Sequence, residues 1–328
     1  MLNVARGVAL WLVVAVVGVG CGGGDDAGSP GGGGSAGSSG ASGSGGANTG
    51  GGANTGGGAN TGGGANTGGS AGTGGGAGTG GSAGAGVCGG PKPNASNTGV
   101  PAGVTLTPSG SITVDKDGTI IEGLDIKGNV TVLADNVTIR KCRITTGTYY
   151  PIRYFDNGNT GLVVEDTEII GTSNDVTSAI AFSNYTARRV NVHGGADGFK
   201  ADANVLIEDC WVHDLANGPG QHNDGVQSTG GKGVTIRHSV LEGASNSAVQ
   251  TGDEGGVATE DMTIECSWLY GGNYTLNIRG GGATKPKNTK VIDNRFGDDA
   301  QYGPWVIDDP NPTVTGNVWD ATGKPLNY

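Results

Sequence analysis

The sequence predicts an all-β solenoid built from parallel strands, and three observations support this fold class. A short segment with alternating apolar and polar residues recurs eight times between residues 137 and 320, at intervals of roughly 20 to 29 residues. Each segment is followed by Gly, Asn and Asp, which are typical of turns. No long helical periodicity competes with the pattern, so each repeat is expected to add one strand to a continuous sheet.

The elements follow from these repeats in chain order. The eight segments begin at Val137, Leu162, Thr186, Val205, Val234, Met262, Thr289 and Thr313. Their apolar residues fall in one register, which predicts one buried and one solvent-facing side for each strand. A second strand is expected from Ala179, Gly198, Gly225, Ala248, Thr275 and Pro304. The coil therefore has at least two strands and a shorter third arm, in a solenoid of about 8 to 10 coils.

The segments VTIRKCRI, VLIEDCWVH and VTIRHSVLE resemble the coils of the right-handed parallel β-helix superfamily, the pectin-lyase-like proteins. The resemblance covers about residues 95 to 325 and implies a right-handed parallel β-helix. It is less specific for activity, because pectate and alginate lyases, polygalacturonases, phage tailspikes and adhesins share this coil.

The N-terminal residues have a different composition. Arg6 precedes an apolar run that is too short to span a bilayer but is typical of a signal peptide. Cys21 follows Gly-Val-Gly and resembles the acylated cysteine of bacterial lipoproteins, although Gly18 stands where leucine is usual. The resemblance implies lipidation at Cys21, and Gly22 after the cysteine implies an outer-membrane or cell-surface anchor.

Residues 22–87 contain almost only Gly, Ser, Ala, Asn and Thr, with GGGANT repeated from Gly50. Such a segment has too little apolar surface to offset the entropy cost of ordering, so it predicts a disordered tether. The expected organisation is a lipoprotein-type signal peptide over residues 1–21, a linker over 22–87 and a β-helix domain over 88–328. The protein is thus expected to be extracytoplasmic and to meet the membrane through its lipid anchor only.

The formal net charge is −11, and residues 1–87 contribute only Arg6, Asp25 and Asp26 to the charged residues. A domain this acidic lacks the basic stripe expected for nucleic-acid binding, so no nucleic acid partner is expected. A polyanionic substrate would need a bound cation or a local basic cluster. The resemblance implies a polysaccharide as the partner, and a monomer is expected.

The cysteines differ in their expected roles. Cys142 and Cys210 share one position of the repeat three coils apart, too far for a disulfide at about 4.8 Å per coil. Both, together with Cys266, are expected to be buried thiols. Cys88 lies at the start of the domain and could pair with Cys142 in an oxidising compartment.

Superimposing the coils brings residues that are distant in sequence to about 5 Å from each other, in three columns. The first column contains Thr145, Ile170, His193, His213, Glu242 and Tyr270. The second contains Asp197, Asp224, Ser247 and Tyr274, and the third Ala181, Lys200, Gln227, Gln250 and Asn277. The third column continues two residues on with Asp202, Thr229 and Arg279. The long turn from Asp214 adds His222 at the same corner.

These residue types suit cleavage of a uronic acid polymer by β-elimination, which needs a base, an acid and a group that neutralises the sugar carboxylate. The catalytic candidates are Lys200 or His222 as base and His193 or His213 as acid. A calcium ion on Asp197 and Asp224 would neutralise the carboxylate. Substrate-binding roles are expected for Gln227, Gln250, Asn277, Arg279 and Tyr274.

Two other enzymatic interpretations are weighed against elimination. Asp197 and Asp224 would suit a glycoside hydrolase that needs carboxylates about 5 to 5.5 Å apart. HNDGVQ resembles the opening of the polygalacturonase motif, but the following coils lack that family's paired Asp and its Gly-His-Gly. A transition metal on His193, His213 and Glu242 is disfavoured because a stacked column gives a line of donors.

A non-catalytic interpretation also stands. Asp, Asn and Gln form ladders on solenoid surfaces without any catalytic role. The domain would then be a glycan-binding or adhesive surface module. The tryptophans, including Trp211, Trp268 and Trp305, are assigned to inward or undecided positions, which leaves few aromatic rings for sugars.

Overall fold

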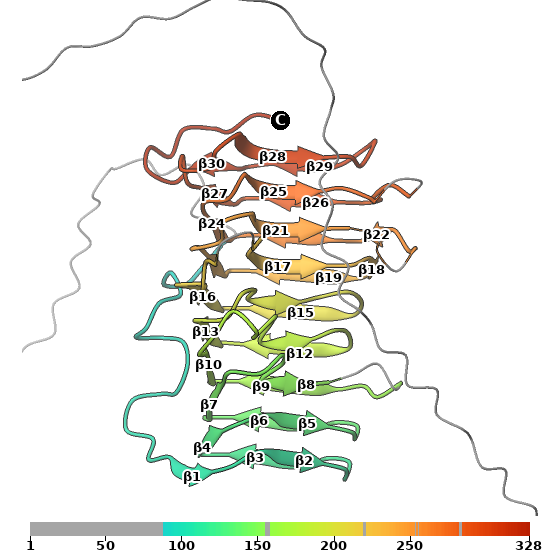
Figure 1. Ribbon diagram of the computed structural model, residues 1–328. Coiled ribbons are helices and arrows are strands. Elements are labelled where there is room, and N and C mark those ends of the chain that lie inside the picture. Colours follow the sequence, from blue (N-terminus) through green and yellow to red (C-terminus); the bar gives the residue numbers. More distant parts are fainter. Residues whose placement is uncertain (1–87, 155–157, 219–220, 253, 255, 282–283) are drawn as a thin grey trace, which may run out of the picture. The chain divides into compact units, whose positions relative to one another are not determined.

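The computed structural model describes residues 88–154, 158–218, 221–252, 254, 256–281 and 284–328, and all regular structure in these residues is β. Cys21, the signal peptide and the linker lie outside the described residues. The strands stack as the coils of a parallel β-helix, with one strand of each long sheet per coil (Figure 1). Ten strands in the longest sheet confirm the expected solenoid of 8 to 10 coils. No helix in the described part of the chain is long and apolar enough to cross a membrane.

The coils form three faces, and every strand pair within the sheets is parallel. The ten-stranded sheet contains β1 (Thr107–Ser109), β4 (Leu124–Lys127), β7 (Arg143–Thr146), β10 (Glu168–Gly171), β13 (Asn191–His193), β16 (Trp211–His213), β20 (Val240–Leu241), β24 (Trp268–Leu269), β27 (Arg295–Phe296) and β30 (Val318–Trp319). The nine-stranded sheet contains β3 (Ile120–Glu122), β6 (Thr138–Arg140), β9 (Leu162–Glu165), β12 (Tyr185–Arg188), β15 (Val205–Glu208), β19 (Val234–Arg237), β23 (Thr263–Glu265), β26 (Lys290–Ile292) and β29 (Thr313–Thr315).

The third face is divided between two sheets. A four-stranded sheet contains β2 (Ile112–Val114), β5 (Val130–Val132), β8 (Ile152–Arg153) and β11 (Ile180–Ala181). A five-stranded sheet contains β14 (Phe199–Lys200), β17 (Asp224–Ser228), β21 (Ser247–Thr251), β25 (Tyr274–Ile278) and β28 (Gly303–Ile307). A small pair is formed by β18 (Gly231–Lys232) and β22 (Thr259–Glu260).

Each predicted repeat segment is divided into two strands by one residue in the left-handed conformation. Lys141, with a φ of 51°, separates β6 from β7. The same position is occupied in later coils by Asp166, Arg189, Asp209, His238, Cys266 and Asp293. A positive φ is uncommon for residues with a Cβ, and here it turns the chain from the nine-stranded to the ten-stranded sheet. The repeat pattern predicts one strand in this place, and the structure has two.

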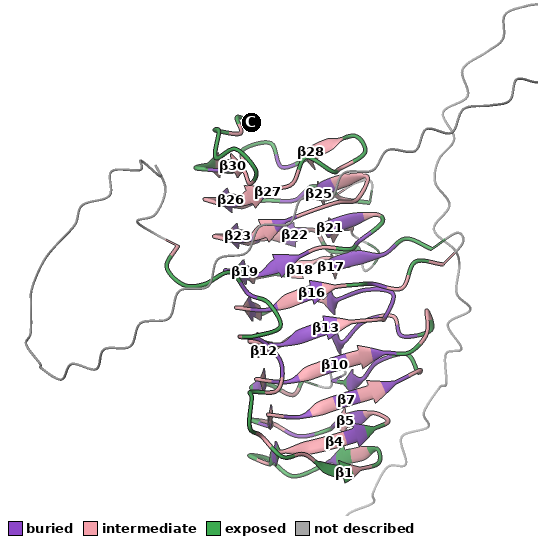
Figure 2. Ribbon diagram, turned by 90° about the vertical axis from the view of Figure 1, so that its left-hand side faces the viewer, coloured by how far each residue is buried: buried purple, intermediate pink, exposed green. Residues whose placement is uncertain are grey.

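The core is a set of vertical columns of aliphatic side chains. Ile139, Val164 and Ala187 are register partners in the nine-stranded sheet, and all three are fully buried. Figure 2 shows buried segments in the successive coils. Burial of each Val or Ile side chain contributes about 1.5 to 3 kcal/mol, so the repeat of apolar positions stabilises the whole stack.

A column of small polar residues runs through the interior directly after the left-handed turn. The backbone N–H of Ser267 donates to Oδ1 of Asn294 at 2.9 Å, and that of Asn294 donates to Oδ1 of Asn317 at 3.0 Å. These bonds satisfy buried groups from coil to coil. Cys142 and Cys210 occupy the same column as buried free thiols, which confirms their predicted state.

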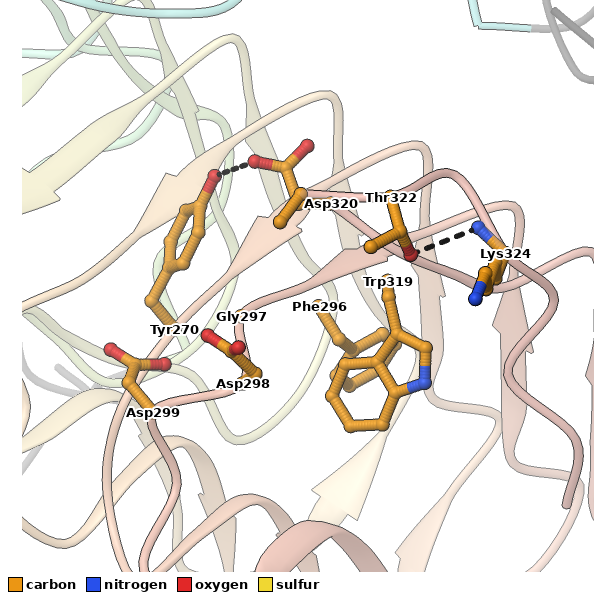
Figure 3. A pocket seen from close by; sticks show the side chains of 10 residues that line it. Tyr270, Phe296, Gly297, Asp298, Asp299, Trp319, Asp320, Thr322 and Lys324 are labelled. Atoms are coloured by element: carbon orange, nitrogen blue, oxygen red, sulfur yellow. Dashed lines mark hydrogen bonds between the residues drawn. The ribbon is translucent and has the colours of Figure 1, made fainter.

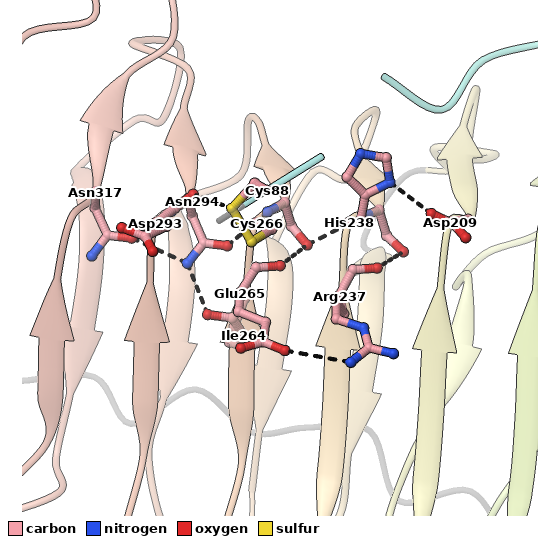
Figure 4. Close-up of a disulfide and its surroundings, with 12 residues drawn as sticks. Cys88, Asp209, Arg237, His238, Ile264, Glu265, Cys266, Asp293, Asn294 and Asn317 are labelled. Atoms are coloured by element: carbon pink, nitrogen blue, oxygen red, sulfur yellow. Dashed lines mark hydrogen bonds and ion pairs between the residues drawn. A yellow bond between two sulfur atoms is a disulfide. The ribbon is translucent and has the colours of Figure 1, made fainter. Parts of the chain in front are cut away.

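Residues 88–104, which we call the strap, run outside the coils toward β1 (Figure 1). The strap is fixed by a disulfide between Cys88 and Cys266, with the Cα atoms 5.3 Å apart (Figure 4). The predictions of a free Cys266 and of a bond from Cys88 to Cys142 are therefore wrong. Cys266 occupies the left-handed turn, with φ of 53°, where it meets the strap, whereas Cys142 lies in the interior column.

Candidate functional site

The outer face of the five-stranded sheet carries the predicted third column in register. Lys200 pairs with Gln227, Gln227 with Gln250, and Gln250 with Asn277 on successive strands. Each of these four side chains is half-buried and follows a buried residue on its strand, so all four lie on the outer face. We call these four residues the amide column.

Several polar groups of the amide column have no partner among the described residues. Among the described residues, none forms a hydrogen bond or an ion pair with the ammonium of Lys200 or with the side-chain amide of Gln227. The side-chain oxygen of Asn277 is buried and lacks a partner within the same described part. Lys200 and Gln227 are half-exposed, so solvent can satisfy their polar groups, whereas the buried oxygen of Asn277 is an exception to the rule that buried polar groups are paired.

Asp197 and Asp224 lie beside the amide column as buried steps of a polar ladder. Oδ1 of Asp197 accepts the backbone N–H of Asp224 at 2.9 Å, and Oδ1 of Asp224 accepts the side-chain amide of Asn246 at 2.9 Å. Asn273 extends the ladder to Asn246 at 3.4 Å. The exposed fraction is 8% for Asp197 and 1% for Asp224, so both carboxyl groups are withdrawn from solvent.

Burial determines the protonation of these two carboxyl groups. It raises the pKa of Asp197 to about 6, against the effects of the Asp224 N–H and the Lys200 charge. Burial, and after it the charge of Asp197, raises the pKa of Asp224 well above its usual range. Asp224 therefore retains its proton to higher pH than an ordinary carboxyl group does.

These properties do not suit the calcium site that was expected at Asp197 and Asp224. Calcium takes about six to eight oxygen ligands and favours ionised carboxylates. Here each carboxyl group already accepts an N–H, and the high pKa of Asp224 favours the neutral acid. Among the described residues, no group of three or more His, Cys, Asp and Glu side chains is arranged to hold a metal.

The predicted histidine column lies on another sheet. His193 and His213 are register partners on β13 and β16, and their rings stack with centroids 5.0 Å apart. His213 uses both ring nitrogens, with Nδ1 at 2.7 Å from Asp214 and Nε2 at 2.9 Å from Asn191. A role as catalytic acid would require His213 to release one of these bonds.

His193 is part of an ion-pair network. Its Nε2 lies 3.3 Å from Oε1 of Glu168, whose Oε2 accepts Nε–H of Arg143 at 2.6 Å. The bonds from His193 and then Arg143 outweigh burial and lower the pKa of Glu168 to about 2. The structure thus brings Lys200 together with the amides and Asp residues, and it places His193 and His213 on the ten-stranded sheet.

The remaining candidates surround the amide column. His222 is exposed in the turn that leads into β17. Arg279 is exposed, and its guanidinium lies 5.7 Å from the ring centroid of Tyr274. Arg279 follows β25, three strands from Lys200 in the five-stranded sheet, as the alignment of coils predicts.

Sequence reasoning missed a groove on the ten-stranded sheet. Trp211 and Trp268 are half-buried on its outer face, because they alternate with the buried residues Val212 and Leu269. Alternation was the available signal, but the large apolar rings favoured an inward interpretation. A pocket of about 330 Å³ is lined by Trp211, His213, Asp214, Glu242, Gly243, Tyr270 and Asp299. An adjoining pocket of about 480 Å³ also contains Tyr270 and Asp299 (Figure 3).

The fold and these surfaces define a parallel β-helix protein with a polar column on the five-stranded sheet and a groove on the ten-stranded sheet. Comparison with protein-family models, curated proteins and solved structures finds no match to this chain.

Proposed function

We propose that this protein acts on polysaccharide and cleaves a uronic-acid-containing glycan by β-elimination along the amide column. The observation that carries this proposal is the ammonium of Lys200, which has no ion-pair partner among the described residues and continues into three amide side chains. A cation followed by amides suits a chain of sugars that bears carboxylate and hydroxyl groups.

In this proposal Lys200 holds and neutralises the sugar carboxylate. An ammonium that neutralises the sugar carboxylate carries its proton and cannot act as a base, so Lys200 in this role is not the base. This assignment gives the base to His222, which is exposed and stands two residues before Asp224.

The elimination step balances within these roles. His222 takes the proton from C5 of the uronate, the electron pair forms the double bond between C4 and C5, and the bond from C4 to the leaving oxygen breaks. The imidazolium of His222 then gives the proton to that oxygen. Because Asp197 and Asp224 do not suit calcium, no step uses a metal.

The test is incubation of the full chain with a panel of uronic acid polymers while the ultraviolet absorbance of the unsaturated product is followed. The wild-type protein is expected to give a rise that a chelator leaves unchanged. Lys200→Met is expected to lose at least about a hundredfold in kcat/KM, because it removes a charge-assisted bond to the reacting sugar. Lys116→Met, at an exposed position near β2, is the matched control. An active Lys200→Met variant would contradict the assignment of Lys200.

Glycoside hydrolysis is the second candidate, favoured by the raised pKa of both Asp197 and Asp224. Their burial counts against it, since a catalytic carboxyl group must reach the glycosidic bond. New reducing ends without ultraviolet absorbance would indicate hydrolysis. Glycan binding with no product would indicate a binding or adhesive module.

We also propose that the protein is extracytoplasmic and anchored through a lipid on Cys21. The disulfide between Cys88 and Cys266 supports this location, because such bonds persist in oxidising compartments. Mass spectrometry of the membrane fraction is expected to find acylated Cys21, and Cys21→Ser is expected to release the protein. An unmodified Cys21 would overturn the anchor.

A further inference from the structure

The groove on the ten-stranded sheet is a second candidate binding site, on a different sheet from the amide column. Its pocket of about 330 Å³ lies within the size range of small-ligand sites. The adjoining pocket extends it along the stack and shares Tyr270 and Asp299 with it (Figure 3).

Carboxylates predominate among the residues that line the first pocket of the groove, and the ammonium of Lys92 bonds to one of its rings, Tyr270. Three acidic residues line the first pocket, namely Asp214, Glu242 and Asp299, and no Lys or Arg is among the lining residues. Burial lowers the pKa of His213, so its imidazole is neutral near pH 7 and adds no positive charge. An anionic sugar would meet repulsion here.

The carboxylates are held in place with acceptor capacity to spare. Oε1 of Glu242 accepts the indole N–H of Trp211 at 2.7 Å, and Oδ1 of Asp299 accepts the backbone N–H of Gly271 at 2.9 Å. In both residues the second oxygen has no hydrogen-bond partner among the described residues. These bonds fix the carboxylates before any ligand arrives, which reduces the entropy cost of binding.

The aromatic part of the groove already holds an ammonium. Nζ of Lys92, from the strap, lies 4.7 Å from the ring centroid of Tyr270 and 5.9 Å from that of Trp268, and it donates to the Tyr270 hydroxyl at 2.7 Å. Burial, the hydrogen bond to Asp320 and nearby carboxylates raise the pKa of Tyr270, so the phenol stays neutral. The groove thus places a primary ammonium against an aromatic ring, the arrangement of a cation–π contact.

We propose that the groove binds a protonated amino sugar residue of a glycan. The ammonium lies between the free oxygens of Glu242 and Asp299, and the apolar side of the sugar ring packs against Tyr270. This inference rests on polysaccharide as the ligand class of the protein, but it does not depend on cleavage at the amide column. Carboxylates paired with aromatic rings combine charge recognition with ring stacking.

The test is calorimetric titration of the full chain with a glucosamine tetrasaccharide, its N-acetylated form and a galacturonic acid tetrasaccharide, at mildly acidic pH where the free amines are protonated. The amino form is expected to bind at least about tenfold more tightly than the acetylated form, because acetylation removes the charge. Equal affinity for these two forms would overturn the proposal.

Two isosteric variants locate the site. Glu242→Gln and Asp299→Asn keep the acceptors for Trp211 and Gly271, and each is expected to lower affinity for the amino tetrasaccharide about tenfold. Glu265→Gln, on the nine-stranded sheet, is the control and is expected to leave the affinity for the amino tetrasaccharide unchanged. Unchanged affinity in both groove variants would place the ligand elsewhere.

Spermine serves to separate sugar recognition from general cation binding. Spermine is expected to bind more weakly than the amino tetrasaccharide, because it has no ring to pack on Tyr270. Equal or tighter binding of spermine would overturn the sugar assignment. Lyase activity on uronic polymers is measured in parallel on the wild-type protein and on the control Glu265→Gln, so failure of cleavage is recorded separately from failure of amino-sugar binding.

Discussion

The backbone N–H of Asp224 donates a hydrogen bond to Oδ1 of Asp197 across 2.9 Å, from one coil to the next. The same two residues hold the most perturbed carboxyl groups of the candidate site, because burial opposes their ionisation. The bond that links the two coils lowers the pKa of Asp197, and burial outweighs this effect. Structural ladders and catalytic acids share this signature, so the two roles must be separated by measurement.

Asp197→Asn is expected to change how stability depends on pH. The folded pKa of about 6 lies above the ordinary value of 3.8, so the contribution of Asp197 is fully present below 3.8 and is lost as pH rises through 6. The wild-type protein should therefore lose up to about 3 kcal/mol through this group between about pH 4 and pH 7. The variant should be more stable than wild type by about 1 to 3 kcal/mol at neutral pH, less the weakened hydrogen bond.

Urea unfolding at about pH 5 and about pH 8 measures this difference. Asp308→Asn, at an exposed position, serves as the control and should follow the wild-type curve. An equal change in the free energy of unfolding between the two pH values, in wild type and in Asp197→Asn, would show that Asp197 does not titrate between them.

Tyr185→Phe is expected to destabilise the coil that carries Lys200. The Tyr185 hydroxyl is buried and donates to the backbone carbonyl of Lys200 at 2.7 Å. Its removal leaves that carbonyl unpaired, at a cost of about 1 to 2 kcal/mol in the free energy of unfolding. Chemical unfolding measures the effect, and Tyr149→Phe, at an exposed ring, is the matched control. An unchanged free energy of unfolding in Tyr185→Phe would mean that water replaces the hydroxyl.

Loss of the disulfide is expected to lower the free energy of unfolding by several kcal/mol. Cys88 and Cys266 are separated by 178 residues, and the chain-entropy account of so long a loop gives about 5 kcal/mol as an upper value. Cys88→Ser, Cys266→Ser and the double variant should be destabilised alike, because each removes the same bond. Guanidinium unfolding with and without reductant tests this, and a wild-type curve that is insensitive to reductant would contradict it.

The left-handed turn predicts opposite effects for two substitutions at one site. Lys141 has φ of 51° and only an exposed ion pair with Glu122 to lose. Lys141→Gly relieves the positive φ and should raise or preserve stability within about 1 kcal/mol, whereas Lys141→Val should cost about 1 to 2 kcal/mol. Thermal unfolding of both variants provides the comparison. Equal melting temperatures would show that the turn does not retain this conformation.

The sequence predicted the stacking well because a parallel solenoid repeats one local rule. Alternation around Ile139 gave the strand, and superposition of the repeats placed Lys200 next to Gln227 and His193 next to His213, as the register confirms. The sequence did not predict how deeply each side chain of a column is buried. Asp224 and Lys200 belong to neighbouring columns, yet one is buried and the other half-exposed, because that difference depends on how the loops pack over the corner.

The partner of Cys88 in the disulfide was predicted wrongly for a related reason. Cys142 and Cys266 follow similar repeat letters, but they differ by one position, and that position separates the interior column from the outward turn. The partner of Cys266 lies in the strap, which has no repeat and hence no register to align. The outward orientation of Trp211 was not predicted, because the strand assignment rests on apolar residues facing the core and polar residues facing solvent. A large apolar ring on the solvent-facing side departs from that alternation.

The strap also determines how the domain would respond to mechanical force. A pull on residue 88 passes through the disulfide into Cys266, in the turn just before the eighth strand of the ten-stranded sheet. The tension therefore enters the stack between its ends, where several strands must slide at once, and the first coil is not peeled away alone. A protein held by its N-terminal side in moving fluid would keep its first coils closed, because the covalent bridge carries the load before it reaches them.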